Sequence, residues 1–516
     1  MAIALLSKTE KDRQTSAAQF ERLQRKLVPL WRSIRSLNDD EQTIVVVPSL
    51  SVDIELTPAE VQAYEERFLF ILFLLRQPRA RMVYASSLPI RSEIIEYYLD
   101  LLPGVLSTNA RKRLFLVTPE DGSSSPLSRK LLDRPRLLRQ MRSLLADPNR
   151  AHLVPFNTTE LERDLSLALG IPMYAADPTF LPMGTKTGGR EIFAEEGVPH
   201  PLGRGDLYTE DDAVEALAEI RDRKPSTSGA MVKLNEGVSG QGNAVVRLEG
   251  LCPPGNPEER DQLRERLRAM RFETSGAAYD RYMAKFAQAG GVVEERVQGD
   301  EVRSPSVQLR VTPLGELEVL STHDQLLGGP SGQSFLGCRF PADPAYAGSI
   351  TREAEKVGRR LAREGVLGRF ALDFVVARTA GGEWEPYAIE LNLRKGGTTH
   401  PFLTLQFLTG GTYDPGSAVF TTPAGHRKYF VASDHVESPR YHAFTPEDLL
   451  DIVVDHRLHF DHARQAGVVL HMMSAVATCG RCGLTAVGDS PQESDAIYRR
   501  AIDVLDAEAE ASLRDT

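Results

Sequence analysis

Two apolar strands separated by a glycine pair constrain this chain more than any other stretch of its sequence. The first reads Phe370-Ala-Leu-Asp-Phe-Val-Val376, and the second, after Gly381-Gly382, reads Tyr387-Ala-Ile-Glu-Leu-Asn-Leu-Arg394. A Gly-Gly turn between two such runs predicts an antiparallel hairpin. If the hairpin closes tightly at the glycines, Asp373 lies directly opposite Glu390, with the two side chains about 5 Å apart.

The polar face of this hairpin predicts a metal site. Glu390, Asn392 and Arg394 share one face of the second strand because side chains alternate. Two close carboxylates repel, and one is driven towards its protonated form unless positive charge lies between them. Oxygen ligands from Asp373, Glu390 and Asn392 suit magnesium. The alternative is a solvated outer face, which the apolar flanks disfavour. Pro386 favours a looser loop, but a slip of two residues keeps the face.

A glycine-rich loop and two lysines form a second candidate site. Lys233 lies on a predicted strand just before Gly237, Gly240 and Gly242. Glycines let backbone N–H groups approach phosphate oxygens, and a lysine adds a point charge. Lys186 stands near the start of a helix, where a phosphate can bind. A plain glycine-rich hairpin turn and a solvated lysine are the alternatives.

The segment Gly291-Val-Val-Glu-Glu-Arg-Val-Gln-Gly-Asp-Glu301 reads as an apolar strand that runs into an acidic turn. Exposed backbone in such a linker can pair with the edge of a nucleotide base. An acid such as Glu301 can accept hydrogen bonds from ribose hydroxyls.

The flanking regions predict two further units. Residues 1–165 alternate strand and helix signals, which indicates a parallel α/β sheet. The strands are Thr43–Val47, Arg81–Ala85 and Arg113–Val117, and the helices run from the Thr57 cap through Leu75 and over Ser92–Leu101. The last unit predicts a helix from the Thr445 cap to about Arg464, a strand over Val468–Thr478, a turn over Cys479–Gly483 and a helix over Pro491–Ala507.

Charge and hydropathy exclude some classes of protein. A formal charge of −10 argues against a nucleic-acid partner. The longest apolar run, Phe68–Leu75, falls far short of the roughly 20 residues that span a membrane. The N-terminus lacks the charged start of a secretion signal, and only four cysteines are present, so a cytoplasmic location is expected.

Taken in order, these motifs resemble the ATP-grasp superfamily, whose pattern is a lysine, a lid lysine with a glycine loop, a Glu-Glu-x-Val hinge, and Asp followed by Glu-x-Asn. The extended motif Glu390-Leu-Asn-Leu-Arg-Lys-Gly-Gly-Thr-Thr-His-Pro-Phe402 is similar to peptide ligases related to the pheganomycin-forming enzyme. The resemblance implies an α/β (α+β) ATP-grasp fold. Its domains are a Rossmann-like pre-ATP-grasp domain over 1–165, an ATP-grasp domain over 166–427 with a lid at about 200–292, and a small α+β domain over 428–516.

The resemblance also implies a function. ATP phosphorylates a carboxylic acid (an amino or guanidino acid), and the amine of an amino acid or peptide displaces phosphate to form an amide, as in natural-product biosynthesis. The partners are therefore small molecules, homodimerisation is left open, and the cofactors are ATP and Mg²⁺. The implied metal ligands are Asp373, Glu390 and Asn392. The implied nucleotide-binding residues are Lys186, Lys233, Glu236, Gly237, Ser239, Gly240, Gly242, Glu294, Glu295, Arg296, Val297 and Glu301.

One position departs from the family pattern. Several of these ligases carry an arginine two residues before the metal aspartate, where this chain has Ala371. Arg394, Arg310 or Arg369 can supply that charge, and the catalytic residues expected here are Arg394 and Arg310. A forked guanidinium suits a carboxylate and the transferring phosphoryl oxygens. The alternative for Arg394 is a salt bridge to Glu390 or Asp373.

Two other functions stay open at this level: a small-molecule kinase on the same fold, and a nucleotide-binding regulator without turnover. Several motifs are interpreted as structural. They are the Cys479–Cys482 pair, the histidines His456, His459 and His462 on the expected C-terminal helix, the packed Cys252 and Cys338, and the basic run Arg129–Arg142.

Overall fold

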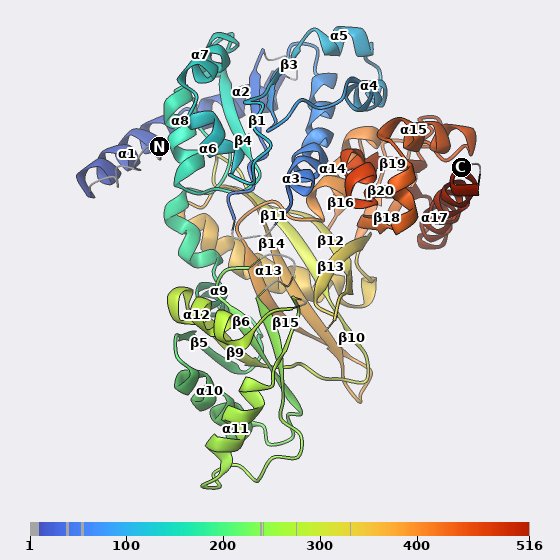
Figure 1. Ribbon diagram of the computed structural model, residues 1–516. Coiled ribbons are helices and arrows are strands. Elements are labelled where there is room, and N and C mark those ends of the chain that lie inside the picture. The colour runs from blue at the N-terminus through green and yellow to red at the C-terminus, as the bar shows by residue number, and fades with distance from the viewer. Residues whose placement is uncertain are drawn as a thin grey trace.

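The computed structural model describes residues 10–37, 41–52, 56–237, 240, 242–274, 276–330 and 332–514, without the side chains of 10–13 and 34–37. Figure 1 shows an N-terminal layer at the top, a long central sheet below it, and a separate small sheet at the bottom. The C-terminal segment lies beside the N-terminal layer, against one end of the central sheet. None of the described helices combines the length and apolar character that crossing a membrane requires.

The N-terminal layer is a four-stranded parallel sheet in the order β3-β2-β1-β4, which confirms the predicted α/β pattern. Its strands are β1 (Thr43–Val47), β2 (Arg81–Ala85), β3 (Leu114–Val117) and β4 (Ala151–Pro155). Its helices are α1 (Glu10–Gln24), α2 (Leu27–Leu37), α3 (Pro58–Glu66), η1 (Arg67–Arg76), α4 (Ser92–Asp100), α5 (Ser107–Arg111), α6 (Leu127–Leu132), α7 (Pro135–Ser143), η2 (Pro148–Arg150) and α8 (Glu160–Leu169). β1 is buried along its whole length, as expected for a parallel strand covered on both faces.

The helix expected from Thr57 to Leu75 is present in two parts. Thr57 caps α3 through a reciprocal pair of hydrogen bonds with Glu60, as the sequence predicts. The apolar run that follows forms the 3₁₀ helix η1, whose side chains are almost all buried. η1 packs against the C-terminal half of the molecule within one large core, so it ties the two ends of the chain together.

The small sheet at the bottom of Figure 1 is antiparallel, in the order β5-β9-β6-β7-β8. Its elements are β5 (Gly203–Leu207), α10 (Glu210–Arg223), β6 (Gly229–Leu234), β7 (Asn243–Arg247), α11 (Glu259–Arg268), β8 (Arg271–Phe272), α12 (Tyr279–Ala289) and β9 (Gly291–Glu295). These elements enclose a hydrophobic core of their own. We call them the lid, and they correspond to the region expected at about 200–292.

The central sheet has nine antiparallel strands, in the order β10-β14-β11-β12-β13-β18-β20-β19 with β15 paired to β14. Its strands are β10 (Val302–Arg303), β11 (Pro305–Val311), β12 (Leu317–Gly328), β13 (Ser334–Phe340), β14 (Gly368–Arg378), β15 (Trp384–Asn392), β18 (Tyr429–Glu437), β19 (Gly467–His471) and β20 (Arg481–Gly488). The remaining elements are η3 (Pro178–Gly184), α9 (Lys186–Glu195), α13 (Pro344–Glu364), α14 (Thr399–Thr409), β16 (Thr412–Asp414), β17 (Val419–Thr421), η4 (Pro439–Ala443), α15 (Pro446–Asp455), η5 (Met473–Ala475), α16 (Val476–Cys479) and α17 (Pro491–Arg514). The strands expected in a separate unit after residue 428 therefore extend this same sheet.

Several C-terminal predictions were wrong in their boundaries. The helix that begins at the Thr445 cap ends at Asp455, because Arg457 takes a left-handed conformation and turns the chain. The expected strand to Thr478 stops at His471, since Met472 is left-handed as well. Cys479 ends a short helix, and the terminal helix runs on to Arg514. The three histidines after Asp455 therefore share no helix face.

The predicted β14–β15 hairpin forms, and it places Asp373 directly opposite Glu390. Its turn is looser than the expected Gly381-Gly382 closure, because Thr379 pairs with Glu383 and leaves three residues in the loop. The extra loop residue shifts the pairing between the turn and Phe374 by one position, so that Phe374 pairs with Ala388. A β-bulge at Ile389 removes the shift before the acidic residues are reached.

A buried histidine gives this core a pH dependence. His323 on β12 is fully buried between Phe340, Phe402 and Phe430, and burial lowers its pKa to about 3. The unfolded chain binds a proton below about pH 6.5 that the folded chain rejects, so stability falls as the pH drops below that value. We expect His323 to account for about 2 kcal/mol of the unfolding free energy that the chain loses between pH 7.5 and pH 5. The variant His323→Gln should not show this part of the loss.

The measurement is urea unfolding at both pH values. His462→Gln is the control, since this histidine is exposed. A pH dependence that is the same in the His323 variant and in the unmodified chain would contradict the assignment.

Candidate functional site

One pocket collects residues from all parts of the molecule. Asp373, Glu390 and Arg394 line it from the hairpin, and Lys186 and Lys233 line it from α9 and the lid. The N-terminal layer and the C-terminal segment complete its wall. We call this the acidic-pair pocket. The hairpin residues Glu390, Asn392 and Arg394 also border an adjoining pocket beneath the glycine loop.

The acidic pair is electrostatically strained, as the sequence predicts. Asn392 Nδ2 donates to Asp373 Oδ2 at 2.9 Å, and Gln325 Nε2 donates to Asp373 Oδ1 at 2.8 Å. Burial and the neighbouring Glu390 raise the pKa of Asp373 to about 6. Burial opposes ionisation of Glu390 too, but Lys186 and Arg394 outweigh it and hold the pKa of Glu390 below its ordinary value.

Lys186 is held in place by the fold around the start of α9. Thr185 caps this helix by accepting a hydrogen bond from the Gly188 N–H. Asn235, at the end of β6, accepts hydrogen bonds from the Thr187 N–H and hydroxyl, which docks the helix start onto the lid. Lys186 Nζ then donates to Glu390 Oε1 at 2.5 Å. The lysine therefore connects the lid side of the pocket with the acidic pair.

Lys233 lies on β6 in a buried ion cluster. Its ammonium pairs with Glu294 on β9, and Arg190 from α9 pairs with the same carboxylate at 2.9 Å. Burial alone would raise the pKa of Glu294, but the two cations outweigh it and lower that pKa. The side chain of Glu294 is thus engaged in this ion cluster, and its backbone lies in β9 between β5 and β6.

The glycine loop connects β6 and β7 above the same pocket. Gly240 lines the pocket and has φ +81°, and a Cβ there would approach Gln333 O to 2.6 Å. Glu236 and Gly237 border the adjoining pocket, and Gly242 also has positive φ. The backbone thus requires glycine at two of the predicted positions. The predicted Ser239 lies outside the described residues.

The remaining hinge residues lie away from both pockets. The Glu295 carboxylate accepts hydrogen bonds from the Leu202 N–H and from Lys224 Nζ. Arg296 is exposed, and neither it nor Val297 lines either pocket within the described residues. Glu301 pairs with Arg303. The structure therefore does not bring these four side chains to the acidic pair.

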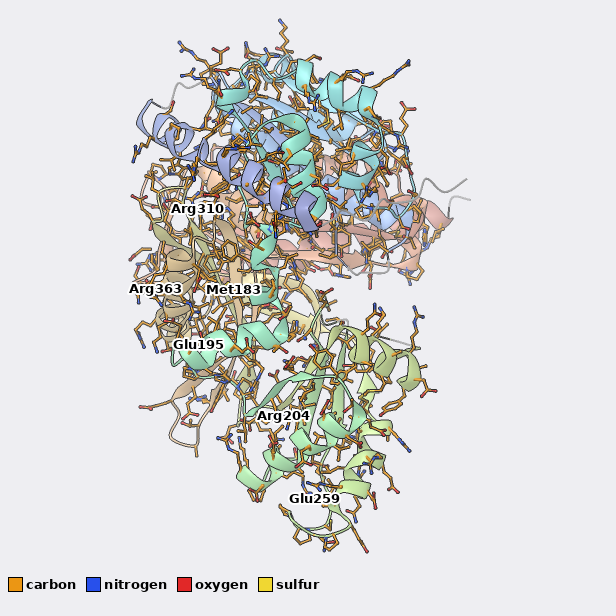
Figure 2. All side chains as sticks on the ribbon, turned by 90° about the vertical axis from the view of Figure 1, so that its left-hand side faces the viewer. Met183, Glu195, Arg204, Glu259, Arg310 and Arg363 are labelled. Atoms are coloured by element: carbon orange, nitrogen blue, oxygen red, sulfur yellow. The ribbon has the colours of Figure 1, made fainter. Side chains whose placement is uncertain are left out.

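The two expected catalytic arginines lie in different places. Arg394 lines the acidic-pair pocket, and its positive charge favours ionisation of both Asp373 and Glu390, so the neutralising alternative stays open beside the clamp role. Arg310 on β11 instead pairs with Glu318 and lies over the Trp31 ring. Figure 2 shows Arg310 high in the molecule, towards the N-terminal layer. The expectation that Arg310 acts beside Arg394 is corrected, because Arg310 lies four positions along β11 from Ser306, the strand partner of Asp373.

A buried polar network at the pocket wall was missed by the sequence analysis. Arg67 from η1 pairs with Asp434 from β18. His400 and His471 place Nε2 at 3.2 and 2.8 Å from Asp434 Oδ1. Burial lowers the pKa of His400 to about 3, so this ring is neutral. Arg67 already balances Asp434, so the network needs no cation and fixes Arg67 at the pocket. Its members come from four distant segments, and only His400 belongs to a motif quoted in the sequence analysis.

The acidic pair has the chemistry of a magnesium site. The side-chain oxygens of Asp373, Glu390 and Asn392 are hard donors that face one pocket. The raised pKa of Asp373 reflects burial first and repulsion by Glu390 second, and a divalent cation would relieve both. The lysines stand on the lid side of the same space. This arrangement suits an anionic ligand bound through a cation to the hairpin and through ammonium groups to the lid.

Comparison with known proteins identifies the fold. The family model described as "IQCH-like, ATP-grasp" matches residues 257–416, and the PGM1 C-terminal domain model matches residues 448–501. A biotin carboxylase complex from Campylobacter jejuni superposes with a TM-score of 0.54 at 14% identity, covering 91% of this chain and 92% of that one. The chain has the ATP-grasp fold. The resemblance expected from its motifs is confirmed.

Two further similarities extend the comparison. The ADP complex of an N5-carboxyaminoimidazole ribonucleotide synthetase has a TM-score of 0.51 at 11% identity, covering 90% of this chain and 97% of that one. The L-propargylglycine–L-glutamate ligase of Streptantibioticus cattleyicolor is 29% identical over 450 residues, which are 85% of this chain and 88% of that protein. The similarity to the ligase therefore extends beyond the residues that the ATP-grasp family model matches.

The ion cluster in the lid allows a stability test. Glu294→Gln leaves Lys233 and Arg190 buried without their counter-charge, which costs about 3–5 kcal/mol. The control is Glu219→Gln, which breaks the exposed Glu219–Arg204 pair of the same lid (Figure 2 labels Arg204) and costs about 1 kcal/mol or less. Urea unfolding followed by circular dichroism measures both. Equal losses in the two variants would show that the buried cluster does not stabilise the lid.

Proposed function

We propose that this ATP-grasp protein is an ATP-dependent ligase that joins a carboxylic acid to the amine of an amino acid or peptide. The relative that spans most of the chain is named as a ligase of two amino acids. The observation that carries the proposal is the acidic-pair pocket, which places Asp373, Glu390, Lys186, Lys233 and Arg394 around one space. Such a set serves phosphoryl transfer, which depends on positioning and charge neutralisation.

The residues of the pocket have distinct proposed roles. Lys186 and Lys233 hold the α- and β-phosphates, and the glycine loop covers them. Asp373, Glu390 and Asn392 hold magnesium, which when bound neutralises phosphate charge. The hinge backbone from Glu294 to Val297 reads adenine, and Glu301 holds the ribose. None of these residues lines the acidic-pair pocket, so this last assignment rests on the family resemblance.

The proposed reaction has two steps. A substrate carboxylate oxygen attacks the γ-phosphorus of ATP, which gives an acyl phosphate and ADP. The amine nitrogen then attacks the acyl carbon, the C–O bond to phosphate breaks, and the amine loses a proton, leaving an amide and inorganic phosphate. The lid excludes water from the acyl phosphate, which would otherwise hydrolyse.

The setting of the reaction is part of the proposal. The substrates are small molecules, an amino or guanidino acid and an amino acid or short peptide, as in natural-product biosynthesis. All four cysteines are free thiols, which supports a reducing compartment such as the cytoplasm.

The reaction can be tested by measuring phosphate release with pooled amino acids, guanidino acids and short peptides, and analysing the products by mass spectrometry. We expect ADP, phosphate and a new amide, with phosphate release dependent on both substrates. Asp373→Asn and Glu390→Gln each lower turnover by orders of magnitude, because the metal site loses a charged ligand.

The matched control is Glu385→Gln, an exposed acid on the same strand. Pyrophosphate and an adenylated acid would contradict the acyl-phosphate route. A phosphorylated alcohol without free phosphate would indicate a kinase. Full activity in both acid variants would remove the proposed metal site.

Arg394 provides a separate test of the clamp. It lies two residues beyond Asn392, and burial lowers its pKa against the opposing effect of Glu390 and Asp373. Arg394→Lys keeps a charge but loses the planar fork that holds carboxylate and phosphoryl oxygens. We expect this variant to retain nucleotide binding and to lose at least about 10-fold in ligation rate.

Binding is measured with a fluorescent ATP analogue, and rate by phosphate release. Arg359→Lys, an exposed position on α13, is the control. Parallel losses of nucleotide affinity and rate would assign Arg394 to the nucleotide or metal scaffold instead.

A further inference from the structure

A second cavity lies between the N-terminal layer and the central sheet. Its volume is about 250 Å³, and three cationic side chains border it: Arg310 from β11, Arg369 from β14 and Lys395 from the segment after β15. Trp31 from α2 and Phe407 from α14 form part of its wall. We call this the arginine cavity. None of its lining residues is shared with the acidic-pair pocket.

The charge of the arginine cavity is unbalanced. No acidic side chain lines it among the described residues, and Glu318 is already engaged with Arg310. Arg310 and Arg369 are directly opposite each other across β11 and β14, so their like charges lie close together. Burial and Arg310 lower the pKa of Arg369 to about 10, and burial lowers that of Lys395 to about 7. Buried cations without counter-charge are costly, which favours an anion in this space.

Hydrogen-bond donors without partners surround the same cavity. Arg369 Nη1 and Trp31 Nε1 are buried, and neither has a hydrogen-bond partner in the described part of the chain. His152 Nδ1 is also buried there without a partner, and this nitrogen of a neutral ring donates or accepts according to the tautomer. Buried polar groups in proteins are nearly always paired, so such a cluster indicates a missing acceptor. Water molecules can accept from these donors, but they cannot balance the arginine charge.

The rest of the cavity is mostly apolar, with Gln42, Gln77, Gln406 and Tyr174 as its other polar lining residues. Phe70, Ile71 and Leu74 from η1 face Leu403 and Phe407 from α14 across it. A small inorganic anion would leave this part of the cavity empty, whereas an organic acid fills the apolar part with its hydrocarbon body and places its carboxylate at the arginines. Forked guanidinium groups match a carboxylate in geometry as well as charge.

We propose that the arginine cavity binds an organic monocarboxylate with an apolar or aromatic body, at a site separate from the acidic-pair pocket. Arg369 and Arg310 hold the carboxylate, Trp31 donates its indole N–H, and η1 and α14 enclose the body. The inference does not depend on the ligase proposal, because it uses none of the residues of that reaction. It also gives Arg310 a ligand-binding role in place of the corrected catalytic one.

The two tryptophans of the chain provide the assay. Trp31 lines the cavity, whereas Trp384 lies on β15 beside Tyr346. In a Trp384→Phe chain, the fluorescence of Trp31 reports ligand in the cavity directly. The probes are 4-phenylbutyrate and its uncharged amide, which share one body. We expect saturable binding of the acid, at least about 10-fold tighter than that of the amide.

Substitutions assign the signal to the arginines. In the Trp384→Phe background, Arg369→Gln lowers the affinity for the acid to that for the amide. Arg363→Gln on the exposed side of α13 (Figure 2) leaves it unchanged. Leu74→Phe fills the apolar part of the cavity without altering its charge, and we expect it to abolish binding. This second variant tests the proposal even if the Arg369 variant does not fold.

Three results would overturn the proposal. They are equal affinities for acid and amide, unchanged binding in both the Arg369 and Leu74 variants, and displacement of the acid by ATP with magnesium. The last result would place the acid in the acidic-pair pocket. Because the assay measures binding without turnover, its outcome is separable from that of the ligase test.

Discussion

The repulsion between Asp373 and Glu390 is the constraint on which the rest of the site depends. Two half-buried carboxylates face each other across one hairpin, and the surrounding structure supplies positive charge to them. Lys186 reaches Glu390 from the start of α9, and Arg394 approaches from the end of the hairpin itself. The position of α9 depends in turn on Asn235 at the rim of the lid. Lid, helix and hairpin are thus arranged around one local excess of negative charge.

The sequence was most informative where the physics is local. Alternating apolar residues around a glycine turn are sufficient to predict the hairpin, its polar face and the pairing of Asp373 with Glu390. The turn itself was predicted one residue too short, and the bulge at Ile389 compensated for that error. Capping at Thr57 was equally predictable, because the capping box is contained within four residues.

Long-range packing set the limit of these predictions. Arg67, Asp434, His400 and His471 meet only because η1 and the C-terminal strands share one core, and no motif in the sequence links these four positions. Arg310 has the residue type that the chemistry demands, but the length of β11 carries it to another cavity. The left-handed residues Arg457 and Met472 end their elements without the glycine that would have marked the positions.

The strand order of the central sheet has a consequence for the growing chain. β13 pairs on one side with β12, its neighbour in sequence, and on the other with β18, which is synthesised only after the hairpin, α14 and the β16–β17 pair. Until β18 emerges from the ribosome, β13 presents an unpaired edge, and exposed edges invite association with other chains. The apolar side chains of η1 pack against the same C-terminal segment, so they are not fully buried until that segment has been synthesised. If translation stops before β18 is made, the incomplete chain therefore keeps an unpaired edge at β13. The C-terminal strands are the ones that complete the sheet.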